Sequence, residues 1–151
     1  MGKVDAMMKN WLGHREVLEE LLKPIADEHV NFKPWDGAKS LGELALHVTQ
    51  WNQTFATLVK TGECRVPEPL TLTSMSDVRA LVAELTEKTK KVYASITDAE
   101  LDLTREFFSG FSASGANFLQ IMYDHEVHHK GQLFVYARMV GVKSVPFFRK
   151  R

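Results

Sequence analysis

The sequence predicts an all-α protein, a four-helix bundle folded as one domain over residues 1–151. Four long stretches repeat apolar residues at spacings of three, four and seven, the period of an amphipathic α-helix. No stretch shows the sustained alternation of apolar and polar residues that is typical of a half-buried β-strand. With 151 residues, of which 44% are hydrophobic, the chain is long enough and apolar enough to bury the core of one domain.

The first helix is predicted over residues 4–26. Its apolar stripe consists of Met8, Trp11, Leu12, Leu18, Leu21, Leu22 and Ile25. Arg15 interrupts this stripe, and Pro24 lies near the predicted end of the helix. The segment 31–39, which contains Pro34 and Gly37, is expected to be an ordered loop.

The second helix is predicted to begin after Ser40. The Ser40 hydroxyl can accept a hydrogen bond from the Glu43 amide while the Glu43 side chain reaches back, which is a capping box. Its stripe consists of Leu41, Leu44, His47, Val48, Trp51, Phe55 and Leu58. Gly62 is the expected C-cap, and residues 63–73 form a connection long enough to cross the end of a bundle or to run along it.

The remaining two helices are predicted from about Ser74 to Ile96 and from Gly115 or Ala116 to Val140. A short turn starts at residues 97–98, and the segment 103–114 is expected to pack its phenylalanines over the core as a lid or an edge. The stripe of the fourth helix consists of Phe118, Met122, His125, His129, Gln132, Leu133 and Tyr136, with Gly141 following as the expected end signal.

The charge balance argues against several classes of partner. Nineteen basic and nineteen acidic residues cancel, so we expect no binding to a nucleic-acid backbone, and residues 149–151 are interpreted as a solvated tail. No segment has the apolar length of a membrane span or a signal peptide. The single Cys64 fits a reducing compartment, and the expected localisation is cytoplasmic.

Three histidines carry the chemistry that the sequence predicts. His125 and His129 are four residues apart in a helix, so both imidazoles can reach one point, where they suit a divalent transition metal. His47 occupies a core-facing position of the second helix. Counted at about 1.5 Å per residue, His47 reaches the level of the pair whether the two helices run the same way or in opposite directions. The sequence therefore predicts a metal site of His47, His125 and His129 with open coordination positions.

Other interpretations remain open for the polar residues around this site. Buried histidines also occur as hydrogen-bonded packing residues, and His14 and His29 are interpreted as surface or loop residues. Gln50, Gln132 and His128 are candidates for supporting the ligands through hydrogen bonds, although each also fits a plain polar position at the edge of a helix.

The residues 40–48 (SLGELALHV) and 124–133 (DHEVHHKGQL), together with the loop at 32–35, resemble the DinB/YfiT-like superfamily over nearly the whole chain. The resemblance implies a four-helix bundle that is often a homodimer, with a divalent metal held by three histidines that match His47, His125 and His129. Some relatives are thiol-dependent transferases and isomerases that use bacillithiol or mycothiol.

These observations predict a metal-dependent enzyme acting on a small molecule, with a low-molecular-weight thiol S-transferase as the first hypothesis. The metal is expected to be zinc, nickel, iron or manganese, and a thiol is the expected co-substrate. The alternatives are a metal-dependent hydrolase that activates water, a non-catalytic metal- or ligand-binding protein, and a structural helical dimer with vestigial histidines.

Overall fold

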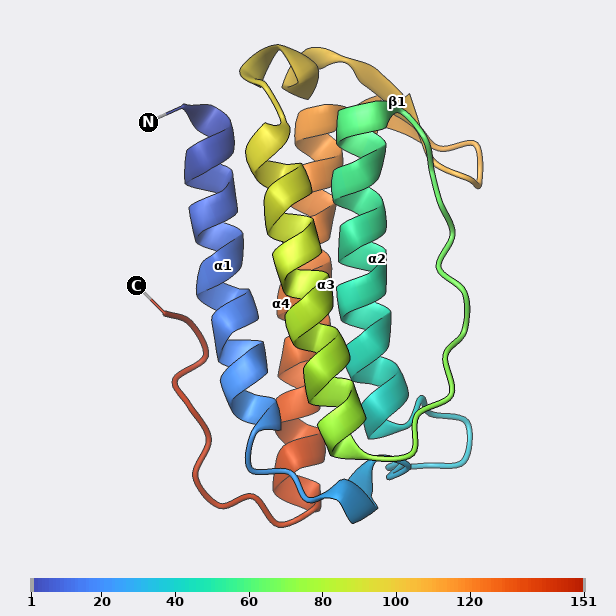
Figure 1. Ribbon diagram of the computed structural model, residues 1–151, viewed down its shortest axis with the longest axis vertical. Helices are drawn as coiled ribbons and strands as arrows, with labels where there is room; N and C mark the ends of the chain where they lie inside the picture. Colours follow the sequence, from blue (N-terminus) through green and yellow to red (C-terminus); the bar gives the residue numbers. More distant parts are fainter. Residues whose placement is uncertain (1, 151) are drawn as a thin grey trace.

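The computed structural model describes residues 2–150, which form a bundle of four long helices (Figure 1). The helices are α1 (Lys3–Leu22), α2 (Leu41–Thr61), α3 (Met75–Ser95) and α4 (Gly115–Met139). The connections contain two 3-10 helices, η1 (Asp27–His29) and η2 (Asp98–Asp102), and two short antiparallel strands, β1 (Thr104–Glu106) and β2 (Ser112–Ser114). The predicted all-α four-helix bundle is confirmed.

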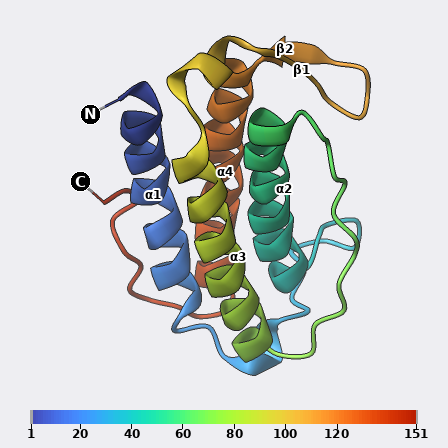
Figure 2. The same ribbon diagram turned by 45° about the horizontal axis from the view of Figure 1, so that its top comes forward.

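The connection between α2 and α3 determines the topology of the bundle. Residues 62–74 run back along the outside of the bundle, so α2 and α3 point the same way while α1 and α4 point the opposite way (Figures 1 and 2). Of the two courses that the sequence left open for this segment, the chain takes the one along the bundle. Both α1 and α2 pack against α3 and against α4. His47 and the two α4 histidines therefore lie on neighbouring antiparallel helices.

Local sequence signals determine where the helices begin and end. The hydroxyl oxygens of Ser40, Ser74 and Ser114 accept hydrogen bonds from backbone amides three residues further on, at 3.1–3.2 Å, which satisfies amides that the first helical turn leaves without a partner. At the other end of α2, Gly62 adopts a left-handed conformation with φ of 82°, as expected for a glycine C-cap.

Two predicted segments differ in the structure. The first helix ends at Leu22 rather than at Ala26, because Pro24 has no amide hydrogen and disfavours helical geometry in the preceding residue. Residues 103–114, predicted to pack their phenylalanines over the core as a lid or an edge, contain the unpredicted β1–β2 hairpin at one end of the bundle (Figure 2). Each strand has only three residues, which is too short to produce a recognisable alternation.

The core has two apolar clusters separated by a polar layer. One cluster lies between the C-terminal halves of α1 and α4 and the N-terminal halves of α2 and α3, and the other fills the opposite end. Between them each helix contributes buried polar residues: Arg15, Thr49, Asn52, Thr86, Thr89 and Glu126. The candidate ligands belong to the same level of the bundle. Within residues 2–150, no helix combines the length and the hydrophobicity needed to cross a membrane.

The C-terminal segment packs its backbone against α1, which was not predicted, while the side chains of Arg149 and Lys150 are exposed, as expected for a solvated tail. The Lys150 amide donates to the Gly13 carbonyl at 2.8 Å, and Arg149 donates to the Asn10 side chain at 3.0 Å. A Cβ atom at Gly13 would lie 2.8 Å from the Lys150 carbonyl oxygen, so a glycine is needed for this approach. Arg151 lies outside the described residues.

Candidate metal centre

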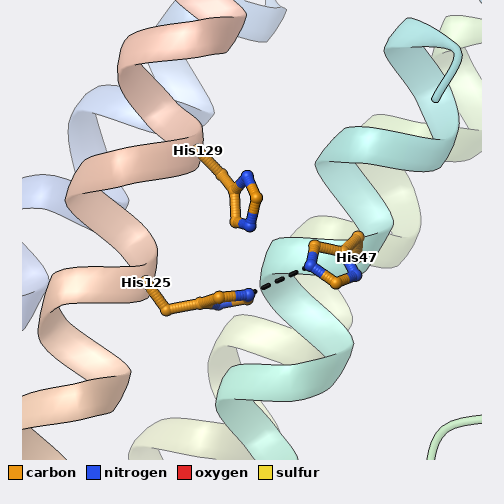
Figure 3. Close-up of side chains that lie close together, drawn as sticks. All are labelled: His47, His125 and His129. Atoms are coloured by element: carbon orange, nitrogen blue, oxygen red, sulfur yellow. Dashed lines mark hydrogen bonds between the residues drawn. The ribbon is translucent and has the colours of Figure 1, made fainter. Parts of the chain in front are cut away.

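The structure brings the three predicted ligands together. The candidate ligand atoms of His47, His125 and His129 all lie within 4.8 Å of one another, and the three residues are half-buried. Figure 3 shows the imidazole rings of His125 and His129 reaching from α4 toward His47 on α2. The Nε2 atoms of His47 and His125 are 3.1 Å apart. Two helices thus place three imidazoles in one small volume.

The environment keeps these imidazoles neutral. Burial and the neighbouring histidine charges lower the pKa of His47 to about 4 and that of His125 to about 3. Burial is also the largest cause that lowers the pKa of His129. A neutral imidazole has one nitrogen lone pair, and this is the form that binds a metal.

Two of the histidines have a hydrogen-bond partner for the nitrogen that faces away from the cluster. Gln132 Oε1 lies 2.7 Å from His129 Nδ1, so Gln132 contacts a candidate ligand as the sequence suggested. Asn52 Oδ1 lies 3.0 Å from His125 Nδ1. Such contacts orient the ring and select its tautomer.

The other two supporting candidates lie differently. The Gln50 side chain donates to the Glu68 carbonyl at 3.2 Å, so it holds the connection between α2 and α3 rather than a histidine. His128 is exposed, with its ring 4.6 Å from that of His129, and it points to the outer side of α4 as its position in the helix predicts. His129 is the inward member of the two.

The sequence did not predict a buried hydrogen-bond network behind His125. Asn52 Nδ2 donates to Glu126 Oε1 at 2.7 Å, and Arg15 binds both oxygens of this carboxylate at 2.7 and 3.0 Å. Trp11 Nε1 donates to Glu126 Oε1 at 3.1 Å, and Arg15 also donates to the Thr86 hydroxyl at 3.0 Å. The position of Arg15 inside the apolar stripe of α1 was the only signal of this network in the sequence.

His14 is buried, which corrects its assignment as a surface or loop residue. It is 3% exposed, its Nε2 lies 3.0 Å from the Tyr123 hydroxyl and its Nδ1 lies 2.7 Å from Lys130 Nζ. The C-terminal segment lies beside this pair, because Lys130 also donates to the Phe148 carbonyl. His29 lies in η1 and is half-buried.

A pocket of about 460 Å³ opens beside His47, between the first half of α2 and the connection that follows it. Lys39, Glu43 and Glu68 bring charges of both signs to its lining. Trp51 lines the pocket as well and contacts Phe107 and Phe108 of the hairpin, with ring centroids 5.7 and 5.8 Å away. His47, alone among the three histidines, therefore borders a space large enough for a small molecule.

The residues present fit a divalent metal ion. Two nitrogen ligands at about 2.0–2.1 Å from one ion, in tetrahedral or octahedral geometry, lie roughly 2.8–3.4 Å apart. The 3.1 Å between His47 Nε2 and His125 Nε2 falls in this range. Three neutral imidazoles are a donor set for zinc, nickel or iron, and they leave coordination positions open.

Comparisons with known proteins agree with this fold. The chain is 33% identical over 155 residues to the protein YjoA of Bacillus subtilis, covering 100% of this chain and 99% of YjoA. The crystal structure of YjoA, a DinB-like protein, superposes with a TM-score of 0.85 at 30% identity and covers 97% of this chain and 99% of YjoA.

Two more distant structures share the fold. YfiT from Bacillus subtilis, described as a probable metal-dependent hydrolase with an unusual four-helix bundle topology, matches with a TM-score of 0.69 at 16% identity, covering 93% of this chain and 90% of YfiT. A mutant of the mycothiol-dependent maleylpyruvate isomerase matches with a TM-score of 0.67 at 9% identity, covering 87% of this chain and 61% of the isomerase. The model of the DinB family matches residues 1–150. The chain therefore belongs to the DinB family.

Proposed function

We propose that this protein is an enzyme that uses a divalent metal ion, held by His47, His125 and His129, to act on a small polar molecule. The observation that carries the proposal is the convergence of three neutral imidazoles beside a pocket of about 460 Å³. Histidines that served only as packing residues would not be expected to converge on one point next to a pocket.

The protein's own residues would hold the ion and shape the space around it. The low pKa values of His47 and His125, which follow from burial, keep their lone pairs available at neutral pH. Lys39, Glu43 and Glu68 suit a substrate that carries charges of its own. When bound, a divalent ion supplies Lewis acidity, which lowers the pKa of a thiol or of water and makes it nucleophilic at neutral pH.

The nucleophile is expected to come from outside the chain. Ser40 lines the pocket, but it is buried and its hydroxyl caps α2 by accepting from the Glu43 amide. We propose thiol transfer first, in which a low-molecular-weight thiol forms a carbon–sulfur bond as the bond to the leaving group breaks and the thiol proton passes to solvent. Hydrolysis, the reaction class in the description of YfiT, is the second candidate.

A paired substrate screen tests this function. Protein loaded with zinc, nickel, iron or manganese is incubated with aryl halides plus glutathione, bacillithiol or mycothiol, and separately with activated esters and amides. We expect turnover with one metal in one arm, and a loss of at least about 100-fold in His125→Ala assayed under the same conditions. Equal rates for wild type and His125→Ala in every arm would contradict catalysis at this site and favour a non-catalytic binding protein.

A further inference from the structure

The direction of each hydrogen bond behind His125 follows from the chemistry of Glu126. Its carboxylate oxygen Oε1 receives Trp11 Nε1, Arg15 Nη2 and the Asn52 side chain at 3.1, 2.7 and 2.7 Å. Trp11 and Arg15 are donors only, and a carboxylate paired with a guanidinium is an acceptor only. The Asn52 atom that faces Glu126 must therefore be its amide nitrogen.

This orientation fixes the other end of the Asn52 side chain. With Nδ2 turned to Glu126, the carbonyl oxygen Oδ1 faces His125 Nδ1 at 3.0 Å. An amide oxygen can only accept, so His125 must carry its proton on Nδ1. The lone pair of the neutral ring is then on Nε2, the nitrogen that faces His47 at 3.1 Å.

We infer that Asn52 is a positioning residue, whose carboxamide holds His125 in the tautomer that presents Nε2 to the metal site. The inference rests on the proposed metal site and adds to it the residue that prepares one ligand before an ion arrives. Asn52 and Glu126 are both 0% exposed, so solvent does not compete for the hydrogen bond between them, and the hydrogen bond from Asn52 to His125 is partly buried. Gln132 offers the same kind of contact to His129 at 2.7 Å, but that hydrogen bond is exposed.

The same argument assigns the proton of His47 in the metal-free protein. Two lone pairs do not face each other at 3.1 Å. His47 Nε2 therefore carries a hydrogen atom and donates a hydrogen bond to the lone pair of His125 Nε2. His47 is thus the ligand whose tautomer must change when an ion binds through this nitrogen, whereas His125 is already prepared.

Imidazole ¹⁵N spectra of the metal-free wild-type protein test the tautomer directly. We expect His125 to be protonated on Nδ1 and unprotonated on Nε2 at pH 7. This measurement needs neither a metal nor a variant, so it is independent of the proposed function. A His125 ring protonated on Nε2, or one averaging between both tautomers, would overturn the inference.

Three variants then test the consequence for metal affinity, with zinc as the probe in competition with a chromophoric chelator. Asn52→Leu removes the acceptor, and we expect about 10- to 100-fold weaker zinc binding together with loss of the single His125 tautomer. Asn52→Asp keeps an acceptor for His125, so zinc affinity should stay within a few-fold of wild type even though a second carboxyl beside Glu126 lowers the melting temperature. Gln50→Leu is the matched control for replacing an amide side chain of α2 by leucine, because Gln50 donates to the Glu68 carbonyl rather than contacting a histidine.

The outcomes separate this inference from the metal site itself. If Asn52→Leu binds zinc as tightly as wild type, the positioning role is wrong while the site stands. If the zinc affinity of Asn52→Asp falls in proportion to its loss of stability, Asn52 has only a structural role. If the wild type binds none of zinc, nickel, iron or manganese, the proposed function fails, and the tautomer spectrum still decides the role of Asn52.

Discussion

Glu126 shows how a fully buried charge is accommodated at the centre of the bundle. Burial alone would raise its pKa, but the Arg15 charge and the hydrogen bonds from Arg15, Trp11 and Asn52 outweigh this effect and lower the pKa. Both Glu126 and Arg15 are 0% exposed. A buried ion pair of this kind adds little net stability, but losing one partner leaves the other charge uncompensated.

Glu126→Ala should therefore lower the free energy of unfolding by about 3–5 kcal/mol, because it leaves the Arg15 guanidinium buried without a counter-charge. Urea denaturation of metal-free protein measures the effect. Glu106→Ala, at an exposed position of β1, is the control and should change stability by less than about 0.5 kcal/mol. Similar small losses for both variants would show that Arg15 does not depend on Glu126.

The buried histidines predict a pH dependence of the metal-free protein. Burial lowers the pKa of His14 to about 4, below its ordinary value of 6.5, so the folded state binds fewer protons than the unfolded state between these pH values. Stability is full above about pH 6.5 and falls as the pH drops toward about 4. His47 and His125 contribute with the same sign.

Urea midpoints measured from pH 7 to pH 4 check this dependence. His14→Gln should give a shallower decline than wild type, because it removes one of the groups that take up a proton on unfolding. A decline of the same steepness in both proteins would mean that His14 is not held neutral in the folded state.

The sequence predicted the three histidines but not the residues behind them. His47, His125 and His129 were recognisable because a histidine in an apolar stripe is unusual and because a spacing of four places two of them on one face. Asn52 gave no comparable signal. A polar residue within a helix looks the same in the sequence whether it faces solvent or a carboxylate on another helix, and only tertiary packing decides.

At the scale of elements, the β1–β2 hairpin forms an aromatic cover at one end of the bundle. Phe107 stacks on Phe55 with ring centroids 5.5 Å apart and lies 6.2 Å from Phe118. Phe108 is 61% exposed and contacts the Phe107 and Trp51 rings. The predicted cover of residues 103–114 is thus present, with Phe107 as its anchor.

Phe107→Ala should lower the free energy of unfolding by about 1–3 kcal/mol, since it removes a half-buried ring from contact with two core phenylalanines. Phe108→Ala is the matched control from the next position and should cost less than about 1 kcal/mol because that ring is mostly exposed. Thermal and urea unfolding of both variants measures the difference. The reverse order of stabilities would show that the hairpin is held by another contact.

At the scale of the whole molecule, the connection between α2 and α3 was the part that the sequence left open. Residues 62–74 can extend over about 43 Å, whereas a helix of 21 residues such as α3 is about 31 Å long. The length of this connection therefore permits either a crossing at one end of the bundle or a return along it. The structure takes the return, which makes α2 antiparallel to α4 and forms the pocket beside His47.

The C-terminal segment is a second feature that only the three-dimensional structure shows. Deleting residues 143–151 should lower the melting temperature, because Val145 loses its contact with the core and Lys130 loses the Phe148 carbonyl. Zinc binding should persist, since the three histidines lie on α2 and α4 and none of them contacts this segment in the described structure. Circular dichroism melts and a zinc titration check both parts, and loss of zinc binding in a folded truncation would contradict this separation.

The metal content of untagged protein, determined by elemental analysis, tests the central claim most directly. Wild type should carry about one equivalent of a divalent ion after purification or after reconstitution, while His47→Ala and His125→Ala, shown to be folded by circular dichroism, should carry almost none. An ion retained equally by both variants would contradict the three-histidine site. If the wild-type protein binds none of zinc, nickel, iron or manganese, the metal site is contradicted, and the proposed enzymatic function with it.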